Sequence, residues 1–437
     1  MSKELTAAET LAAFGESLSY QDLPPMIAED IKSRILDFMG ICVAATQLES
    51  SRVVQEYVRS FPAGGSSTAI GIAGNVMAEY AAFMNGVLAH SLDYDDTHLP
   101  SVLHPSAVVI PAVLAVAEEV GSSPEEVIVA IAFGLEVTIR LGMAGYDREK
   151  NNSLFFEYGQ HATSICGSMG ASAAVAKLIG NAETIQHALG VNASMAAGII
   201  ESNRTGGNVK RLHCGWAAHS AVSAAKLAKH GITGPPTVLE GRFGFFWAWL
   251  KGEFFPEELT RNLGTDWAIL DIFFKPYPAN HFTHAVIDCG IQLREMGILP
   301  EQIQSVVLGV PGPAKRTIGE PLEVKQNPQT GYMAQFSAPF AFASGLIGGG
   351  GLGVGLDDFT DEKALDPNYV ALMAKVDVVE DEECTQIFPN QFPAKALVTL
   401  VGGKELRLEV LVNRGGNKNP LSFEELRKKF LDNATRV

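Results

Sequence analysis

Apolar residues recur at helical spacing through roughly the first 250 positions of the chain. An early example follows the pair Pro24-Pro25, which is typical of a helix start. Segment 105–121 begins with Pro and ends with Gly, and Ser123 with Glu126 matches a capping box for the helix after it. The early repeat comprises Ile27, Ile31, Ile35, Phe38, Met39 and Cys42.

Two later segments of the same region, 166–180 and 216–231, are rich in Gly, Ala and Ser. Helices lined with small side chains can approach one another closely and pack into a dense core. No clear alternation of apolar and polar residues, as in a strand, interrupts this part of the chain. The pattern therefore predicts a large all-helical domain.

The pattern changes near Trp267. Segment 303–312 is short and rich in β-branched residues, as in a strand, and segment 394–416 predicts a hairpin. Segment 419–434 predicts a closing helix. We therefore expect a mainly α protein, with a large all-helical domain plus a smaller α+β lid domain.

The expected domain limits follow from this change of pattern. Residues 1–266 form the helical domain, which the C-terminal helix within 417–437 completes. Residues 267–416 form the α+β lid domain.

The composition excludes some classes of function. Of 437 residues, 47% are hydrophobic and 19% charged, which is enough apolar material for a large core. The formal net charge is -16, with acidic residues spread along the chain, which argues against nucleic acid as a partner. An acidic substrate remains possible, because a pocket can be locally basic in an acidic protein.

Other features favour the cytoplasm and no membrane. The N-terminal segment lacks the apolar core of a signal peptide, and the five cysteines are far apart and form no CxxC pair. The uncharged stretch 336–356 contains four consecutive glycines. We interpret it as a buried helix that leads into a glycine loop, and expect neither a membrane span nor a nucleotide site there.

The densest group of ionisable side chains lies within residues 90–106. A metal site is one interpretation, but the histidine spacing is irregular and the loop lacks the Gly and Glu of an EF-hand. A polar helix end with aspartates that cap backbone N–H groups is the second. We favour the third, a pocket wall with a histidine acid or base and without metal. The group comprises Asp93, Asp95, Asp96, His90, His98 and His104.

Two further stretches of the helical region carry candidate chemistry. His161 precedes a small-residue helix, whose N-terminus suits a carboxylate ligand, although a locally satisfied histidine is the alternative. Lys210, Arg211 and His213 follow Gly206-Gly207 and form the densest basic spot of this region. They fit either carboxylate binding with proton transfer or a solvated surface patch.

A fourth stretch, 274–284, lies near the expected domain boundary. Lys275, His281 and His284 could reach a cleft between domains, where small molecules often bind. The alternative is a structural proline turn.

These stretches together resemble the MmgE/PrpD family. The resemblance spans nearly the whole chain and is most specific in AHSLDYDDT (89–97) followed by HPS (104–106). VKRLH (209–213), KPYPA (275–279) and the ending NPLSFEELRKKF (419–430) also match. The resemblance implies a helical domain with an α+β lid, a homodimer, and a site without metal or cofactor.

The resemblance also implies site residues. Pocket residues of the family's decarboxylase branch match Asp93, Thr97, His104, His161, Lys210 and Lys275. Two positions depart, because Asn280 stands where that branch has His, and Phe340 where it has Tyr. Both departures put the decarboxylase reaction in doubt.

The candidate residues are expected to share the work of a carbanion reaction. Lys210, Lys275 and Arg211 are candidate partners of a carboxylate or enolate, and His104 and His161 are candidate proton-transfer groups. Asp93 would orient a histidine or lysine. The expected substrate-binding residues are Thr97, Arg211, His213, Asn280, His281 and Phe340.

The sequence thus predicts a cofactor-independent lyase that acts on a small di- or tricarboxylate. Dehydration or decarboxylation would proceed through a carbanion-like or enolate-like intermediate. The main alternative is an isomerase, an epimerase or racemase that removes a proton and returns it on the other face. A non-catalytic carboxylate-binding protein would be expected to lack the basic and histidine set, which this chain keeps.

Overall fold

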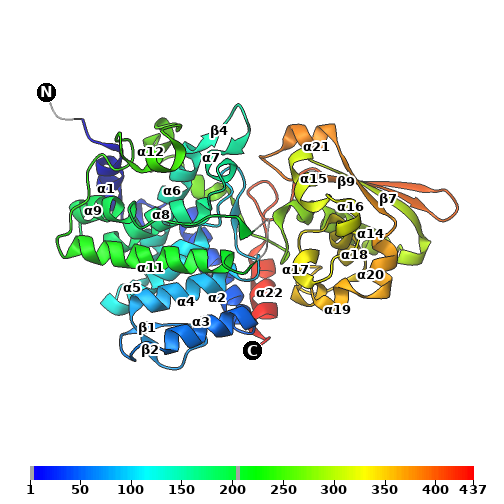
Figure 1. Ribbon diagram of the computed structural model, residues 1–437, viewed down its shortest axis with the longest axis horizontal. Helices are drawn as coiled ribbons and strands as arrows, with labels where there is room; N and C mark the ends of the chain where they lie inside the picture. Colours follow the sequence, from blue (N-terminus) through cyan, green and yellow to red (C-terminus); the bar gives the residue numbers. More distant parts are fainter. Residues whose placement is uncertain (1–3, 203–206) are drawn as a thin grey trace. The chain divides into compact units, whose positions relative to one another are not determined.

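A computed structural model describes residues 4–202 and 207–437 of the chain (Figure 1). The described chain separates into two compact units. The first comprises Met1–Ile272 with Asn433–Val437, and the second comprises Phe273–Asp432. The division lies a few residues after the expected 266/267 boundary. Residues 417–432, which we expected to complete the helical domain, group with the second unit.

The first unit is built from helices and a few two-residue strands. The helices are α1 (Ala7–Ser17), α2 (Pro25–Ala45), α3 (Glu49–Arg59), α4 (Ala78–His90), α5 (Ser106–Val120), α6 (Pro124–Ala144), α7 (Leu154–Glu157), α8 (Ala162–Ile179), α9 (Ala182–Asn192), α11 (Lys210–Lys229), α12 (Phe245–Leu250) and α13 (Glu257–Thr260). The strands are β1 (Ser67–Thr68), β2 (Asn75–Val76), β3 (Thr97–His98), β4 (Tyr146–Asp147) and β5 (Asn152–Ser153).

Local signals set several of these helix ends. α2 begins at Pro25, as the proline pair predicts. Ser123 and Glu126 form both hydrogen bonds of the capping box that starts α6. Gly121 ends α5 with a φ of 70°, in the left-handed region that glycine adopts readily. These boundaries depend on residues only a few positions apart.

Small residues let the central helices pack closely. α11 packs against α4, α8 and α9, and α8 also packs against α5 and α6 (Figure 1). A Cβ added at Gly170 of α8 would lie 2.4 Å from the backbone oxygen of Gly134 of α6. A Cβ at Gly215 of α11 would lie 2.4 Å from the backbone oxygen of Phe83 of α4. The Gly- and Ala-rich segments therefore bring helix backbones together, as their composition predicts.

Two helices of this unit are long and apolar enough to cross a membrane, by length and composition alone. They are α6 and α8, and 94% and 83% of their most apolar windows are buried inside the protein. Burial among neighbouring helices accounts for their apolar sequences.

The second unit combines a sheet with helices. The sheet has the order β10-β9-β7-β8, with β7 and β8 parallel and the other pairs antiparallel. Its strands are β7 (Ile303–Val310), β8 (Val376–Glu380), β9 (Ala394–Leu400) and β10 (Glu405–Val410), and the short β6 (Ile272–Phe273) precedes it. The helices are α14 (His284–Glu295), α15 (Gly312–Ile318), α16 (Leu322–Lys325), α17 (Gly331–Ala334), α18 (Ala338–Ile347), α19 (Asp361–Ala364), α20 (Pro367–Met373), α21 (Glu382–Ile387) and α22 (Phe423–Ala434), whose last two residues lie in the first unit.

The hairpin and the glycine loop form as expected. β9 and β10 are joined through Gly402 and Gly403, with φ values of 101° and 87°. α18 is buried and leads into the glycine loop. The backbone N–H groups of Gly350 and Gly355 donate to Oδ2 of Asp358, at 3.2 and 2.8 Å. The loop thus wraps around a carboxylate of the chain itself.

The mainly α fold class, with a mixed sheet in the C-terminal part, is confirmed.

Candidate active site

Ends of four packed helices bring the histidines of the first unit together. His90 is the last residue of α4, His104 lies two positions before α5, and His161 directly precedes α8. His213 lies in the first turn of α11, which begins at Lys210. The ring centroids are 5.2 Å apart for His104 and His90, 5.5 Å for His90 and His161, and 5.0 Å for His161 and His213. We call these four side chains the imidazole row.

His90 and Asp95 form a buried pair at the centre of the row. Nδ1 of His90 lies 2.7 Å from Oδ2 of Asp95, and the two residues are 4% and 3% exposed. A carboxylate accepts the hydrogen bond, so Nδ1 carries the proton. Nε2 of neutral His90 is then a bare acceptor, and it has no hydrogen-bond partner among the residues that the structure describes.

His104 is oriented by the same loop. Its Nδ1 lies 2.8 Å from the backbone oxygen of Asp96 and 3.3 Å from Oγ1 of Thr97. Because a carbonyl oxygen only accepts, Nδ1 of His104 also carries its proton. The backbone N–H of His104 donates to Oγ1 of Thr163 in α8 at 3.1 Å. His104 and Thr97, two predicted site residues, are therefore in contact.

Asp96 has a different partner from its neighbour. Its Oδ2 lies 2.7 Å from Nη1 of Arg34, whose side chain also binds Asp30 at 2.6 Å. Ser106, the first residue of α5, donates to Asp96 through Oγ at 2.5 Å and through N at 3.3 Å. Asp96 thus connects the start of α5 to α2, whereas Asp95 binds His90. The capping interpretation holds for Asp96.

Two residues of this loop adopt a backbone conformation that side chains disfavour. Asp93 and Val102 have φ values of 52° and 54°, in the left-handed region. Val102 is β-branched, so the conformation is costly there, of the order of 1–3 kcal/mol. Asp95 and Thr97 lie between the two strained residues, and His104 follows Val102 by two positions. Asp93 itself, a predicted catalytic residue, is only partly buried.

The other half of the imidazole row carries depressed pKa values. Nδ1 of His161 lies 2.9 Å from Nδ1 of His213, so one ring donates and the other accepts. Burial lowers the pKa of His161 well below its ordinary value, and His90, Lys210 and His213 lower it further. Burial, His90 and Lys210 lower the pKa of His213 to about 4. Both rings are therefore neutral near pH 7, beside a lysine at the N-terminus of α11.

Arg211, the second residue of α11, binds a residue of α3. Its Nη1 donates to Oγ of Ser50 at 2.7 Å. Its predicted role in substrate binding stays a prediction. Gly206, which precedes this basic stretch, lies outside the described residues.

The predicted lysine of the second unit lies in a firmly held segment. Lys275 is 1% exposed. The backbone N–H of Phe274 donates to the backbone oxygen of Gly415 at 2.9 Å, and Nη1 of Arg414 donates to the Tyr277 hydroxyl at 2.8 Å. Contacts to a distant part of the chain therefore hold the backbone on both sides of Lys275.

The remaining predicted residues also lie in the second unit. Nε2 of His281 lies 3.0 Å from Nδ2 of Asn413, and Oδ1 of Asn280 accepts from the backbone N–H of Phe282 at 3.1 Å. Phe340 is fully buried and stacks on Tyr369, with ring centroids 5.2 Å apart. Asn280 thus acts locally as a helix cap, and Phe340 is part of the core of the unit. Their roles in substrate binding stay predictions.

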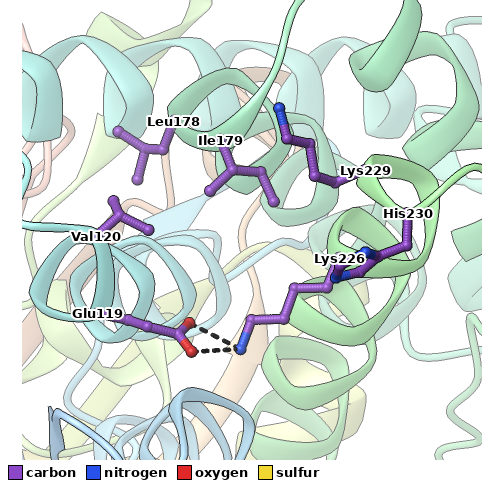
Figure 2. Close-up of a pocket in the computed structure, with 7 residues that line it drawn as sticks. All are labelled: Glu119, Val120, Leu178, Ile179, Lys226, Lys229 and His230. Atoms are coloured by element: carbon purple, nitrogen blue, oxygen red, sulfur yellow. Dashed lines mark hydrogen bonds and ion pairs between the residues drawn. The ribbon is translucent and has the colours of Figure 1, made fainter.

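A surface hollow of about 620 Å³ lies elsewhere in the first unit, at the C-terminal ends of α5, α8 and α11 (Figure 2). Lys226 there pairs with Glu119 at 2.7 Å and Glu79 at 3.0 Å. The lining residues are Glu119, Val120, Leu178, Ile179, Lys226, Lys229 and His230, so none of the predicted site residues contributes. Open, charge-paired surface of this kind contrasts with the buried imidazole row.

Comparison with known protein families shows which family the chain belongs to. The MmgE/PrpD N-terminal domain matches residues 9–258, and the MmgE/PrpD C-terminal domain matches residues 277–437. The chain belongs to the MmgE/PrpD family. The resemblance inferred from the sequence motifs is confirmed.

Named relatives within this family are cis-aconitate decarboxylases. The protein of that name from Homo sapiens is 29% identical over 100% of this chain and 89% of its own length. The one from Mus musculus is 28% identical over 99% of this chain and 87% of its own length. The one from Aspergillus terreus is 27% identical over 63% of this chain and 57% of its own length.

His90, Asp95 and Arg34 are not among the site residues predicted from the sequence. His90 and Asp95 lie in the stretch that we singled out, five positions apart across the end of α4. Their spacing carries no helical or strand periodicity, so only the turn after α4 brings them together. Arg34 is 62 positions from its partner Asp96, and no local signal connects the two.

Proposed function

We propose that this MmgE/PrpD protein is a lyase acting on a small di- or tricarboxylate, by dehydration or decarboxylation through an enolate-like intermediate. The observation that carries the proposal is the imidazole row beside Lys210. Relatives named for the decarboxylation of cis-aconitate, itself a small tricarboxylate, support the substrate class.

The electrostatics of the row suit proton transfer at a carbon acid. A neutral imidazole with a depressed pKa can accept a proton near pH 7, which an imidazolium cannot. Lys210 supplies a positive charge for a carboxylate or for the developing enolate. Partial burial of Lys210 strengthens its attraction for a negative charge, because charges interact more strongly where water is excluded.

An isomerase is the second candidate, on one specific observation. His104 and His161 belong to different helix ends and have separate hydrogen-bond partners, Asp96 for the former and His213 for the latter. Two independently held imidazoles could remove a proton from one face of a carbon and return it to the other. The replacements Asn280 and Phe340, relative to the decarboxylase pattern, also leave room for this reaction.

The reaction class can be tested by proton NMR in deuterated water with a panel of di- and tricarboxylates. A lyase yields a new alkene or released carbon dioxide. An isomerase yields deuterium exchange and the opposite stereoisomer, without net elimination. No exchange, elimination or decarboxylation with any member of the panel would contradict both candidates.

Substitution of the row tests which residues carry the reaction. We expect His161→Ala and Lys210→Ala each to reduce kcat/KM by about 10² to 10⁴, because a positioned acid, base or charge contributes on this scale. The matched controls are His230→Ala and Lys229→Ala, at the exposed end of α11, which should remain within a few-fold of the parent. Circular dichroism checks that each variant is folded. Full activity of His161→Ala would remove that residue from the mechanism.

A further inference from the structure

His90 has a buried acceptor atom that no group of the described residues uses. The residue is 4% exposed, and Nε2 has no hydrogen-bond partner among the described residues. Leaving a buried polar atom unpaired costs about 1–3 kcal/mol, so such atoms are rare unless a ligand or reaction uses them. The rings of His104 and His161, the two predicted proton-transfer residues, flank His90 at 5.2 and 5.5 Å.

The partner of Nδ1 decides what Nε2 can do. Asp95 lies 2.7 Å from Nδ1 and holds the proton on that nitrogen. The same carboxylate can balance the positive charge that forms when Nε2 captures a proton. An Asp–His pair of this kind works as a general base in other enzymes, where the carboxylate fixes the tautomer.

A second buried histidine of the same loop provides a contrast. Nδ1 of His98 lies 2.6 Å from the hydroxyl of Ser101, and burial lowers the pKa of His98 to about 3. A hydroxyl carries no charge, so no group at Nδ1 compensates a proton taken up by His98. His90 has a carboxylate at the corresponding position. A carboxylate therefore lies at Nδ1 of His90, whereas an uncharged hydroxyl lies at Nδ1 of His98.

We propose that His90 is a further catalytic residue of the site, with Asp95 as its positioning residue, and that Nε2 of His90 removes the proton from the substrate carbon. The C–H bond breaks, its electron pair stays on the substrate as an enolate, and the proton moves to Nε2 to form an imidazolium next to Asp95. The imidazolium of His90 then gives this proton to the leaving group, so that His90 returns to its neutral form. This inference rests on the proposed carbanion chemistry.

The tautomer can be measured without a substrate. In ¹⁵N-labelled protein at pH 7, two-bond ¹H–¹⁵N spectra distinguish the protonated from the bare ring nitrogen of each histidine. We expect His90 to carry its proton on Nδ1 and none on Nε2, with the signal assigned by its loss in His90→Ala. A proton on Nε2 would overturn the inference, whatever the protein turns over.

Chemical rescue tests the catalytic role itself. We expect His90→Ala to lower the rate of substrate deuterium exchange by about 10² to 10⁴. Added imidazole should restore part of the rate, with methylimidazoles of different pKa giving different rescued rates. A structural role would not produce this dependence.

The matched control is His98→Asn, which removes the other buried histidine of the loop. It should keep its rate within a few-fold and show no response to imidazole. Full exchange by His90→Ala, or a loss in a folded variant that no azole restores, would contradict the inference. If the parent protein exchanges no carboxylate of the panel, the proposed function fails, and the tautomer measurement still decides the state of His90.

Discussion

A buried network of ionisable side chains lies in each unit, and burial shifts the pKa values of the two networks in opposite directions. In the first unit, the imidazole row holds His161 and His213 with lowered pKa values. In the second, the Tyr277 hydroxyl donates to Oδ1 of Asp288 at 2.5 Å, and burial raises the pKa of Asp288 to about 6. Burial favours the neutral form in both, which means loss of a proton for histidine and gain of one for aspartate.

The networks also differ in how they are held. Helix ends carry the imidazole row, and its rings contact one another. The second network clamps a segment without regular structure, because Arg414 binds the Tyr277 hydroxyl on one side and Glu425 of α22, at 2.6 Å, on the other. We infer that the first network is arranged for proton transfer, whereas the second fixes the segment around Lys275.

The largest loss of stability in either network is expected from substitution of Arg34, which anchors the loop of the imidazole row. We expect Arg34→Met to lower the free energy of unfolding by about 3–5 kcal/mol, because Asp96 is left buried without its cation. Urea denaturation measures the change. Lys32→Met, which removes the exposed pair with Glu29, is the control and should leave the free energy of unfolding nearly unchanged. Equal losses for the two variants would show that the Asp96 anchor is not a buried pair in solution.

The second network should make stability fall as pH rises. The pKa of Asp288 is higher in the folded chain, about 6 against an ordinary 3.8, so its contribution is present below about pH 4 and is lost as pH rises through 6. Asp288→Asn keeps an acceptor for the Tyr277 hydroxyl and cannot ionise. Between pH 4 and 7 we expect the variant to gain about 1–3 kcal/mol relative to the parent. A constant difference across this range in urea titrations would refute the raised pKa.

The imidazole row should make stability fall as pH falls. The pKa of His213 is depressed to about 4, so its contribution is present above about pH 6.5 and is lost as pH falls through 4. Between pH 7 and pH 4 we expect His213→Gln to lose about 1–2 kcal/mol less stability than the parent, because glutamine takes up no proton. Part of the loss remains, because the pKa of His161 is also lowered. Differential scanning calorimetry between pH 4 and 7 measures this. An unchanged pH profile would place the proton uptake elsewhere.

Local chemistry explains why much of the fold could be predicted. The start of α2 at Pro25, the capping box of α6 and the hairpin through Gly402-Gly403 all depend on residues within a few positions of one another. The helical and α+β halves followed from a change in hydrophobic period. The gathering of titratable groups in residues 90–106 was visible in the same way.

The partners of those groups could not be predicted. Neighbouring aspartates diverge, since Asp95 contacts His90 and Asp96 contacts Arg34 on α2. Arg211 binds Ser50 of α3, and Phe340 stacks on Tyr369, and no local signal indicated either partner. Each of these outcomes depends on which helix lies beside the residue.

By itself the sequence determined the family, the helical body with its α+β companion, and the stretches that carry histidine and lysine. The tertiary structure alone decided which nitrogen meets which oxygen, and so made His90 a carboxylate-backed base and Asp96 a structural anchor. The physical reason is range: caps and turns form between near neighbours in the chain, whereas burial and its effect on pKa depend on contacts between distant segments.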